Sequence, residues 1–456
     1  MISVHSNAGV GQKGYNAHEI TVHLEKPMLH THTFANGLRV LVEELPHTHS
    51  ISIGFFIGVG SEHEIHPTCG ISHFIEHMLF KGSANYPSPK SISDAIEGVG
   101  GVLDAYTGFD ATVYYAKVAD MHVERAINVL TDMVLWPRFD LQDIEKERRV
   151  IIEELRETED TPSELIDVIL DAAMWGDQPL GRDVAGDYDT VAAITHADML
   201  AYWQTYYTCA NTIVSVAGNI VADQAFQMIE RALSGMVEGA SSTHVPSLPS
   251  YPGPKLSLHT DDSEQSYFCL GLPGIAYTDP RRRAMAVLDT IVGGGSSSRL
   301  FQEIREERGL AYTIGSFIRE HHDTGKWIMY GSVKPEMLHE SIATITEQLR
   351  DIRRHGVTAA ELQQVKEQVK GGMLISLEDT WSVASRNGAH MLRYGHVLPV
   401  EQVVAEIEAV THADVLHVAQ HALRNDALHL AVVGPHDHLT DIQPLLNVEE
   451  NISVKL

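Results

Sequence analysis

The sequence predicts an α+β protein of two homologous domains, each a mostly antiparallel β-sheet flanked by helices. Three observations support this prediction. The chain has 456 residues, which is too long for one ordinary domain. Short β-rich runs alternate with longer helical patterns along it. Segments of the first half also recur in the second half at a nearly constant spacing.

Two runs in the first half are rich in β-branched and aromatic residues and predict strands at 50–59 and 112–118. The apolar residues of 121–133 follow a helical period instead. This mixture of short strands and longer helices is typical of a domain in which helices pack on a largely antiparallel sheet.

The duplication is visible as matched segments. Three pairs match: 194–200 with 410–416, 213–218 with 430–434, and 118–127 with 333–342. Their offsets are 216 (410 − 194), 216 (434 − 218) and 215 (333 − 118). Two equal offsets and a third within one residue of them indicate duplicated domains.

Proline, glycine and serine are concentrated in 236–257, which predicts an exposed linker with the domain boundary near residue 245. We therefore divide the chain into four segments. They are an N-terminal extension (1–30), a first domain (31–236), the linker (237–257) and a second domain (258–456).

The segment 70–80 predicts a helix whose apolar side faces a core. Its apolar residues follow the i, i+3, i+4, i+7, i+8 spacing of one stripe: Ile71, Phe74, Ile75, Met78 and Leu79. Gly82 is the predicted C-terminal stop. His73 and His77 fall on the opposite face, one turn apart, where they point to a cavity or to solvent.

The motif His73-x-x-Glu76-His77 predicts a zinc site. Histidines at i and i+4 leave one face of a helix, so two neutral imidazole nitrogens can bind one ion. Glu76 lies beside them, within reach of a water on that ion, and H-x-x-E-H is the inverzincin order. Because the chain has 27 histidines, a chance match is the alternative, and a third ligand would favour zinc.

The third ligand is predicted on a helix at 143–156. Its apolar stripe consists of Ile144, Val150, Ile151 and Leu155. Glu147 and Glu154 lie within that stripe, whereas Glu145 and Glu153 lie mostly off it. A carboxylate on a buried face is costly unless it is paired or bound to a cation. We therefore predict Glu154 as the metal ligand and Glu147 as a carboxylate that shapes the site. The alternative is a solvated, glutamate-rich helix.

Together these residues resemble those of the M16 metallopeptidases, the family of pitrilysin, insulin-degrading enzyme and the mitochondrial processing peptidase. The 77 positions from His77 to Glu154 (154 − 77), and Glu147 seven residues before Glu154, match the family pattern. The run 73–82 is similar to the short bacterial branch almost letter for letter. The resemblance implies a zinc-dependent endopeptidase that hydrolyses peptides or unfolded protein segments, with one zinc ion per chain. The implied ligands are His73, His77 and Glu154; the implied catalytic carboxylates are Glu76, the general base, and Glu147.

The second half has no H-x-x-E-H, and its helical segment 362–373 places Gly372 opposite Glu154 at an offset of 218 (372 − 154). Its Arg305 and Tyr312 resemble the arginine–tyrosine pair of the family, spaced seven apart, which binds the substrate backbone and stabilises the oxyanion. Without the resemblance, an exposed helical arginine and a core tyrosine would be the simpler interpretation.

The resemblance also implies LuxS/MPP-like domains that assemble as a clamshell. Because one chain carries both the zinc motif and the Arg305/Tyr312 pair, it implies a homodimer in which the second domain of one subunit completes the site of the other. The segment 100–107 resembles the edge strand that pairs with substrate. This makes Asp104, where the family usually has asparagine, together with Ala105 and Tyr106, candidate substrate-binding residues.

Composition excludes several classes of function. A formal net charge of −28 disfavours nucleic-acid binding. No apolar run approaches the length of a membrane-spanning helix, and the N-terminus resembles neither a signal nor a transit peptide. Three scattered cysteines fit a reducing compartment, so we predict a cytoplasmic protein without membrane contact. Histidines outside the motif, such as His63 and His321, are predicted to lie on the surface.

Two other functions compete with the peptidase. One is a non-catalytic relative that binds peptides or helps to assemble a complex; the complete H-x-x-E-H motif disfavours it. The other is a partner-dependent catalytic subunit of a heterodimer. The presence of both Arg305 and Tyr312 on this chain disfavours that alternative.

Overall fold

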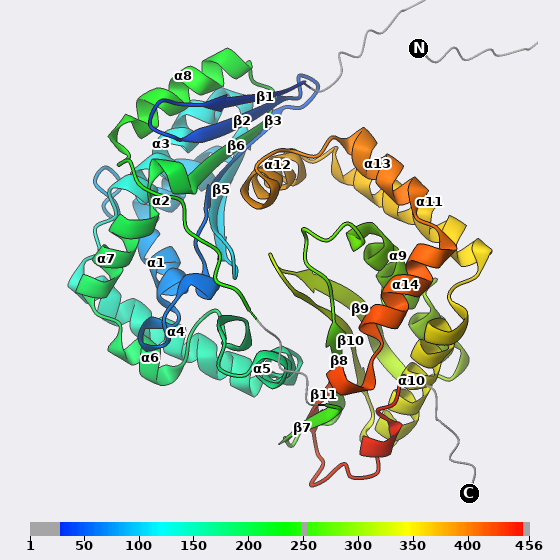
Figure 1. Cartoon of the computed structure of the whole chain (residues 1–456). Coiled ribbons are helices and arrows are strands. Elements are labelled where there is room, and N and C mark those ends of the chain that lie inside the picture. Colours follow the sequence, from blue (N-terminus) through cyan, green and yellow to red (C-terminus); the bar gives the residue numbers. More distant parts are fainter. Residues whose placement is uncertain (1–27, 248–252, 450–456) are drawn as a thin grey trace, which may run out of the picture.

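The computed structural model describes residues 28–247 and 253–449. Within these ranges the chain forms two β-sheets, each flanked by helices, in two halves that face each other (Figure 1). This architecture confirms the predicted α+β fold of two homologous domains. The predicted N-terminal extension at 1–30 lies almost entirely outside the described residues.

The first sheet has the strand order β1-β2-β6-β3-β5-β4. Its strands are β1 (Met28–Thr33), β2 (Arg39–Glu44), β3 (Ser50–Ile57), β4 (Val102–Thr107), β5 (Thr112–Ala119) and β6 (Thr212–Gly218). The pair β2–β6 is parallel and the other pairs are antiparallel. The strands predicted at 50–59 and 112–118 correspond to β3 and β5.

The second sheet has the order β7-β11-β8-β10-β9. Its strands are β7 (Lys255–Thr260), β8 (Ser266–Pro273), β9 (Ala311–Glu320), β10 (Gly325–Val333) and β11 (His429–Gly434). The pair β7–β11 is parallel and the others are antiparallel. This order reproduces the order β2-β6-β3-β5-β4 of the first sheet, as duplication of one domain requires.

Helices cover both sheets. Those of the first half are α1 (Ile71–Leu79), α2 (Pro89–Ile96), α3 (Val123–Leu135), α4 (Leu141–Asp160), α5 (Pro162–Trp175), α6 (Tyr188–Ala193), α7 (His196–Tyr206) and α8 (Ala222–Ala232). Those of the second half are α9 (Arg282–Gly293), the π-helical η8 (Phe301–Glu307), α10 (Leu338–His355), α11 (Ala359–Ser376), α12 (Thr380–Tyr394), α13 (Val400–Ala409) and α14 (His412–Ala422). None of the helices in the described part of the chain is both long and apolar enough to cross a membrane.

The repeated Thr-His-Ala-Asp sequence has the same structural role in both halves. It starts α7 and α14, where a threonine caps the helix and an aspartate three residues later returns the bond. The hydroxyls of Thr195 and Thr411 each accept a hydrogen bond of 3.2 Å, from the backbone N–H of Asp198 and Asp414 respectively. The sequence repeat therefore encodes a capping box at equivalent helix starts.

One helix of each half packs on the sheet of the other half (Figure 1). Helix α5 of the first half packs on β8 and β11, where its Leu170 and Met174 share a hydrophobic cluster with Cys269 of β8 and Val433 of β11. Helix α12 of the second half packs on β3 and β6, and its Trp381 stacks on Tyr115 with ring centroids 3.9 Å apart. Neither sheet completes its hydrophobic contacts with its own half alone.

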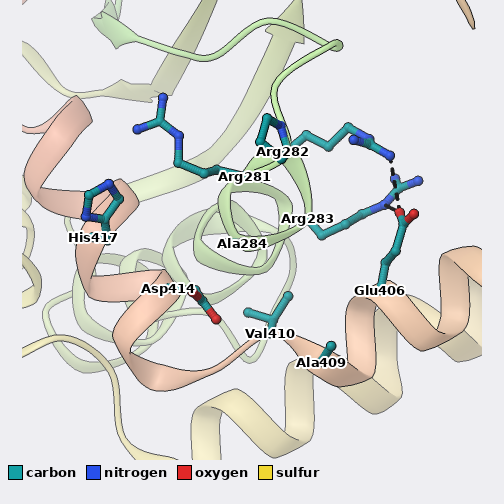
Figure 2. Close-up of a pocket in the computed structure, with 10 residues that line it drawn as sticks. Arg281, Arg282, Arg283, Ala284, Glu406, Ala409, Val410, Asp414 and His417 are labelled. Atoms are coloured by element: carbon teal, nitrogen blue, oxygen red, sulfur yellow. Dashed lines mark hydrogen bonds and ion pairs between the residues drawn. The ribbon is translucent and has the colours of Figure 1, made fainter.

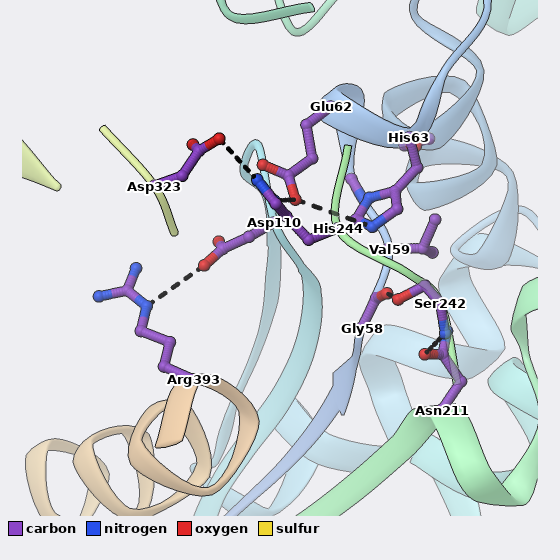
Figure 3. Close-up of polar contacts among 12 residues, drawn as sticks. Gly58, Val59, Glu62, His63, Asp110, Asn211, Ser242, His244, Asp323 and Arg393 are labelled. Atoms are coloured by element: carbon purple, nitrogen blue, oxygen red, sulfur yellow. Dashed lines mark hydrogen bonds and ion pairs between the residues drawn. The ribbon is translucent and has the colours of Figure 1, made fainter. Parts of the chain in front are cut away.

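Polar side chains join the two halves beside these helices (Figure 3). The imidazole of His244 lies between carboxylates from both halves: Nδ1 is 3.3 Å from Glu62 Oε1 and Nε2 is 3.1 Å from Asp323 Oδ2. Arg393 of α12 donates to Asp110 at 3.2 Å. These contacts tie the segment that leaves the first half to both sheets.

Some sequence predictions are wrong in detail. Val150 is 39% exposed, because the stripe of α4 is narrower than predicted. The side chains of His63 and His321 are buried, His63 beside the contacts of Figure 3 and His321 against Phe109, and not on the surface. Strand β7 begins at Lys255, so the last residues of the predicted linker belong to the second sheet. The other domain limits stay predictions.

Candidate metal centre

Helix α1 presents the H-x-x-E-H motif. All residues of its predicted apolar stripe are buried in the first core, which fixes the face that the histidines occupy. The helix ends at Leu79 and Phe80 is its C-cap. Gly82 therefore lies beyond the helix end rather than at it, with a φ of 145°.

The start of α1 is held by a carboxylate from outside the helix. Gly70, the N-cap residue, has a φ of 87°, a conformation that favours glycine, and a Cβ there would lie 2.3 Å from the carbonyl oxygen of Ala185. Since glycine has no capping side chain, the buried Glu64 accepts the N–H groups of Gly70 (2.7 Å) and Ser72 (2.8 Å). These bonds set the helix start directly before His73.

Three predicted ligands converge at one point. Ligand atoms of His73, His77 and Glu154 all lie within 4.8 Å of one another. Nε2 of His77 is 3.2 Å from Nε2 of His73 and 3.6 Å from Oε2 of Glu154. Two imidazole nitrogens and a carboxylate oxygen are the donor set of a catalytic zinc ion.

The protonation preference of His73 suits a cation. Burial, and then the neighbouring His77, lower the pKa of His73 to about 4, so its imidazole is neutral at pH 7. Its Nδ1 is buried and has no hydrogen-bond partner among the described residues. A cation between the facing Nε2 atoms would satisfy both lone pairs, so the residues present fit a zinc ion.

Glu147 contacts His77 on the side of its Nδ1 atom. Its Oε2 is 3.4 Å from His77 Nδ1, and its Oε1 accepts a 2.8 Å ion pair from Lys81. Burial opposes a charged His77, but the bond to Glu147 and the charges of Glu154, Glu76 and Glu147 outweigh it and raise the pKa of His77. Sequence reasoning missed Lys81; its i+4 spacing from His77 was the available signal.

Glu76 is half-buried beside the histidines. Burial raises the pKa of Glu76, and a hydrogen bond from the Thr107 hydroxyl to its Oε2, at 2.5 Å, opposes that rise. A carboxylate with a raised pKa next to a metal site is suited to accept a proton. Thr107 was also missed from the sequence, although it ends the predicted edge strand.

The predicted substrate-pairing segment is indeed at the edge of the sheet. Within the described residues, strand β4 pairs with β5 alone and ends the strand order. Asp104 and Tyr106 are exposed and Ala105 is half-buried. The carboxylate of Asp104 accepts the N–H of Ala105 at 2.8 Å and the hydroxyl of Tyr115 at 3.2 Å.

Arg305 and Tyr312 lie together on the second half, at η8 and at the start of β9. Arg305 Nη1 donates to the Tyr312 carbonyl at 2.8 Å, and the guanidinium carbon is 4.8 Å from the Tyr312 ring centroid. Tyr312 is 78% exposed, so it is not a core tyrosine. No hydrogen bond or ion pair found in the described residues joins this pair to the metal cluster.

A cavity of about 480 Å³ lies elsewhere in the second half, between the start of α9 and the α13–α14 connection (Figure 2). Its arginines have carboxylate partners. Arg282 and Arg283 are 3.2 and 3.0 Å from Glu406, and Arg281 is 2.7 Å from Asp279. Because these charges are already paired, we assign no site there.

Comparison with known proteins identifies similar chains. Residues 39–188 match the family model described as insulinase (peptidase family M16), and 193–369 match the one described as the peptidase M16 inactive domain. The uncharacterized zinc protease YmxG of Bacillus subtilis is 35% identical, over 90% of this chain and 100% of the relative. An uncharacterized zinc protease of Mycobacterium leprae is 37% identical, over 89% and 91% respectively.

Solved structures share the fold. A protease from Helicobacter pylori superimposes with a TM-score of 0.83 at 20% identity, over 89% of this chain and 99% of that one. A peptidase M16 inactive domain from Pseudomonas fluorescens also has a TM-score of 0.83 at 20% identity, over 90% and 98%. At such identities the likeness concerns the fold alone.

Proposed function

The chain belongs to the M16 peptidase family, and from this premise we propose that it is a zinc-dependent endopeptidase acting on peptides or unfolded protein segments. The observation that carries the proposal is the convergence of His73, His77 and Glu154 beside the half-buried Glu76. The names of its relatives as zinc proteases support it.

In this proposal His73, His77 and Glu154 hold one zinc ion, with Glu147 fixing the orientation of His77. A bound zinc ion supplies Lewis acidity, which polarises a carbonyl group and acidifies water. Glu76 takes a proton from the attacking water and passes it to the leaving amine.

Substrate binding involves both halves in this proposal. The free edge of β4 pairs with the main chain of an extended peptide through Asp104, Ala105 and Tyr106, which suits varied sequences because main-chain bonds do not select side chains. Arg305 and Tyr312 bind the substrate backbone and stabilise the oxyanion. The two sites meet in a homodimer, where the second domain of one subunit faces the metal centre of the other.

The test is to measure bound zinc per chain together with cleavage of a quenched fluorogenic peptide library, for the wild type and for Glu76→Gln. We expect one zinc per chain in both proteins, and cleavage by Glu76→Gln that is at least about 100-fold slower than by the wild type. Zinc without cleavage would favour a non-catalytic or partner-dependent subunit. Absence of zinc from both proteins would overturn the proposed metal centre.

A further inference from the structure

Thr107 makes a contact that the proposed mechanism does not use. Its hydroxyl donates to Glu76 Oε2 at 2.5 Å. Glu76 stands on α1, whereas Thr107 is the last residue of the edge strand β4. The hydrogen bond therefore connects the proposed base to the strand that we propose to pair with substrate, and the inference below rests on that proposed function.

The pleat of β4 determines where Thr107 points. Exposure alternates along the strand: Asp104 and Tyr106 are exposed, whereas Leu103 and Ala105 are half-buried and pack against the first core. Residues two apart share a face of a strand, so Thr107 lies on the core side with Leu103 and Ala105. This is the side on which α1 packs.

The backbone around Thr107 is well anchored. Thr107 pairs with Thr112 in the β4–β5 ladder, and the Gly108 N–H donates to the Ala111 carbonyl at 2.8 Å to close the hairpin. Thr112 is buried, and its own hydroxyl donates to the Val59 carbonyl at 2.9 Å. The Thr107 hydroxyl is thus presented from a fixed strand end rather than from a free loop.

A glutamate needs such a partner if one of its oxygens is to act as a base. The terminal torsion of a glutamate side chain is broad, so an unrestrained carboxylate samples many orientations. The Thr107 bond engages one oxygen of Glu76, limits the rotation of the carboxylate and leaves the second oxygen to accept a proton.

We propose that Thr107 is a positioning residue for Glu76, and that β4 therefore serves both to pair with substrate and to orient the base. A substrate strand added to β4 restrains the same strand end that holds the carboxylate. The orientation of Glu76 is then most restrained when substrate is in place.

Three variants test this inference. Thr107→Val keeps the shape of the side chain and removes the hydroxyl, Thr107→Ser keeps the hydroxyl, and Thr112→Val removes the neighbouring hydroxyl that bonds a carbonyl instead of Glu76. With a fluorogenic peptide, we expect Thr107→Val to retain zinc and KM but to lose about 10- to 100-fold in kcat. Thr107→Ser should stay within about threefold of wild type, and Thr112→Val should lower thermal stability without lowering kcat.

An unchanged kcat in Thr107→Val would overturn the inference, as would a serine variant no more active than the valine variant. An equal loss of kcat in Thr112→Val would also overturn it, since the effect would then be general to the hairpin. If the wild type itself cleaves nothing, the proposed function fails. A crystal structure of Thr107→Val then tests the role of Thr107 separately from that function. Displacement of the Glu76 carboxylate from its wild-type position would uphold the role of Thr107, and an unmoved carboxylate would refute it.

Discussion

At the scale of single residues, Glu147 shows how burial and charge cooperate in the candidate metal centre. Its side chain is 2% exposed. The negative charge of its carboxylate is compensated by Lys81, at 2.8 Å, and by His77, at 3.4 Å. A buried carboxylate without such partners would favour its neutral form. Here the bonds to His77 and Lys81 outweigh burial and lower the pKa of Glu147, so it stays charged at neutral pH and supports the His77 imidazole.

We expect Glu147→Gln to weaken zinc binding by about 10- to 100-fold, because a neutral amide no longer increases the basicity of the His77 imidazole. Competition with a chromophoric zinc chelator at neutral pH measures this change. The control is Glu145→Gln, an exposed residue of the same helix whose partner is Arg148, and it should leave zinc affinity unchanged. Equal affinities of Glu147→Gln and wild type would remove Glu147 from the metal centre.

At the scale of elements, α11 is the counterpart of the ligand helix α4, but it has Gly372 opposite Glu154 and carries a structural ion pair in its first turn instead. Glu361 in its first turn accepts the Thr358 N–H at 2.6 Å and the Arg299 Nε at 2.6 Å. Partial burial opposes the charged form, but the bonds from Arg299 and Thr358 outweigh it and lower the pKa of Glu361 to about 2. In this helix of the second domain, an acidic residue thus serves as part of a helix cap.

We expect Glu361→Gln to lower the free energy of unfolding by about 1 kcal/mol at neutral pH, the usual value of a helix cap. Since the pKa of Glu361 is about 2 in the folded protein and near 4.5 otherwise, the charged cap stabilises fully above 4.5. The difference between wild type and variant should shrink as the pH falls from there towards 2. Thermal melts across this range measure it, with the exposed Glu367→Gln as control. A constant difference would contradict the assignment.

The elements that the sequence predicts correctly are those whose signal is local. The stripe of α1 depends on residues within a few turns of each other, and α1 is found where this pattern predicts it. The repeats are also visible in the sequence, because each repeated segment is a run of consecutive residues, and one pair of them starts α7 and α14. The packing of α5 and α12 on the sheet of the opposite half is not visible in the sequence, because each helix packs on strands more than 90 residues away along the chain. For the same reason Thr107 was missed: its contact with Glu76 joins a helix and a strand end 31 positions apart.

At the scale of the whole molecule, α5 and α12 make the two halves interdependent, because each packs on the sheet of the opposite half. Lys326 of β10, whose side chain is 1% exposed, binds Asp167 and Asp171 of α5 at 2.8 and 2.5 Å. Burial raises the pKa of Asp171 to about 6 even with Lys326 beside it. The charges are therefore held in place by each other, across the boundary between the halves.

We expect Lys326→Met to destabilise the protein by about 3–5 kcal/mol, because it leaves the buried Asp171 and the half-buried Asp167 without their main cation. Arg319→Met removes a partner that is 35% exposed and should cost at most about 1 kcal/mol. Thermal unfolding measures both, and limited proteolysis of the segment between the halves should accelerate in Lys326→Met alone. Equal stability of the two variants would show that Lys326 does not hold α5 against the second sheet.

The proposed homodimer makes a quantitative prediction about mixed subunits. Glu76→Gln removes the base of the first domain and Tyr312→Phe removes an oxyanion donor of the second, so neither homodimer contains an intact site. If the sites are completed in trans, refolding the two variants together at equal amounts makes half of the dimers mixed, each with one intact site and one doubly defective site. Peptide cleavage should then recover to about a quarter of the wild-type rate, the fraction expected for random pairing in a twofold dimer. The measurement is cleavage by the co-refolded mixture against the two variants refolded separately and then combined. If the co-refolded mixture cleaves no faster than the separately refolded variants, each chain uses its own Tyr312 or a different partner. Random pairing of subunits that complete each other's sites would otherwise always produce some intact sites.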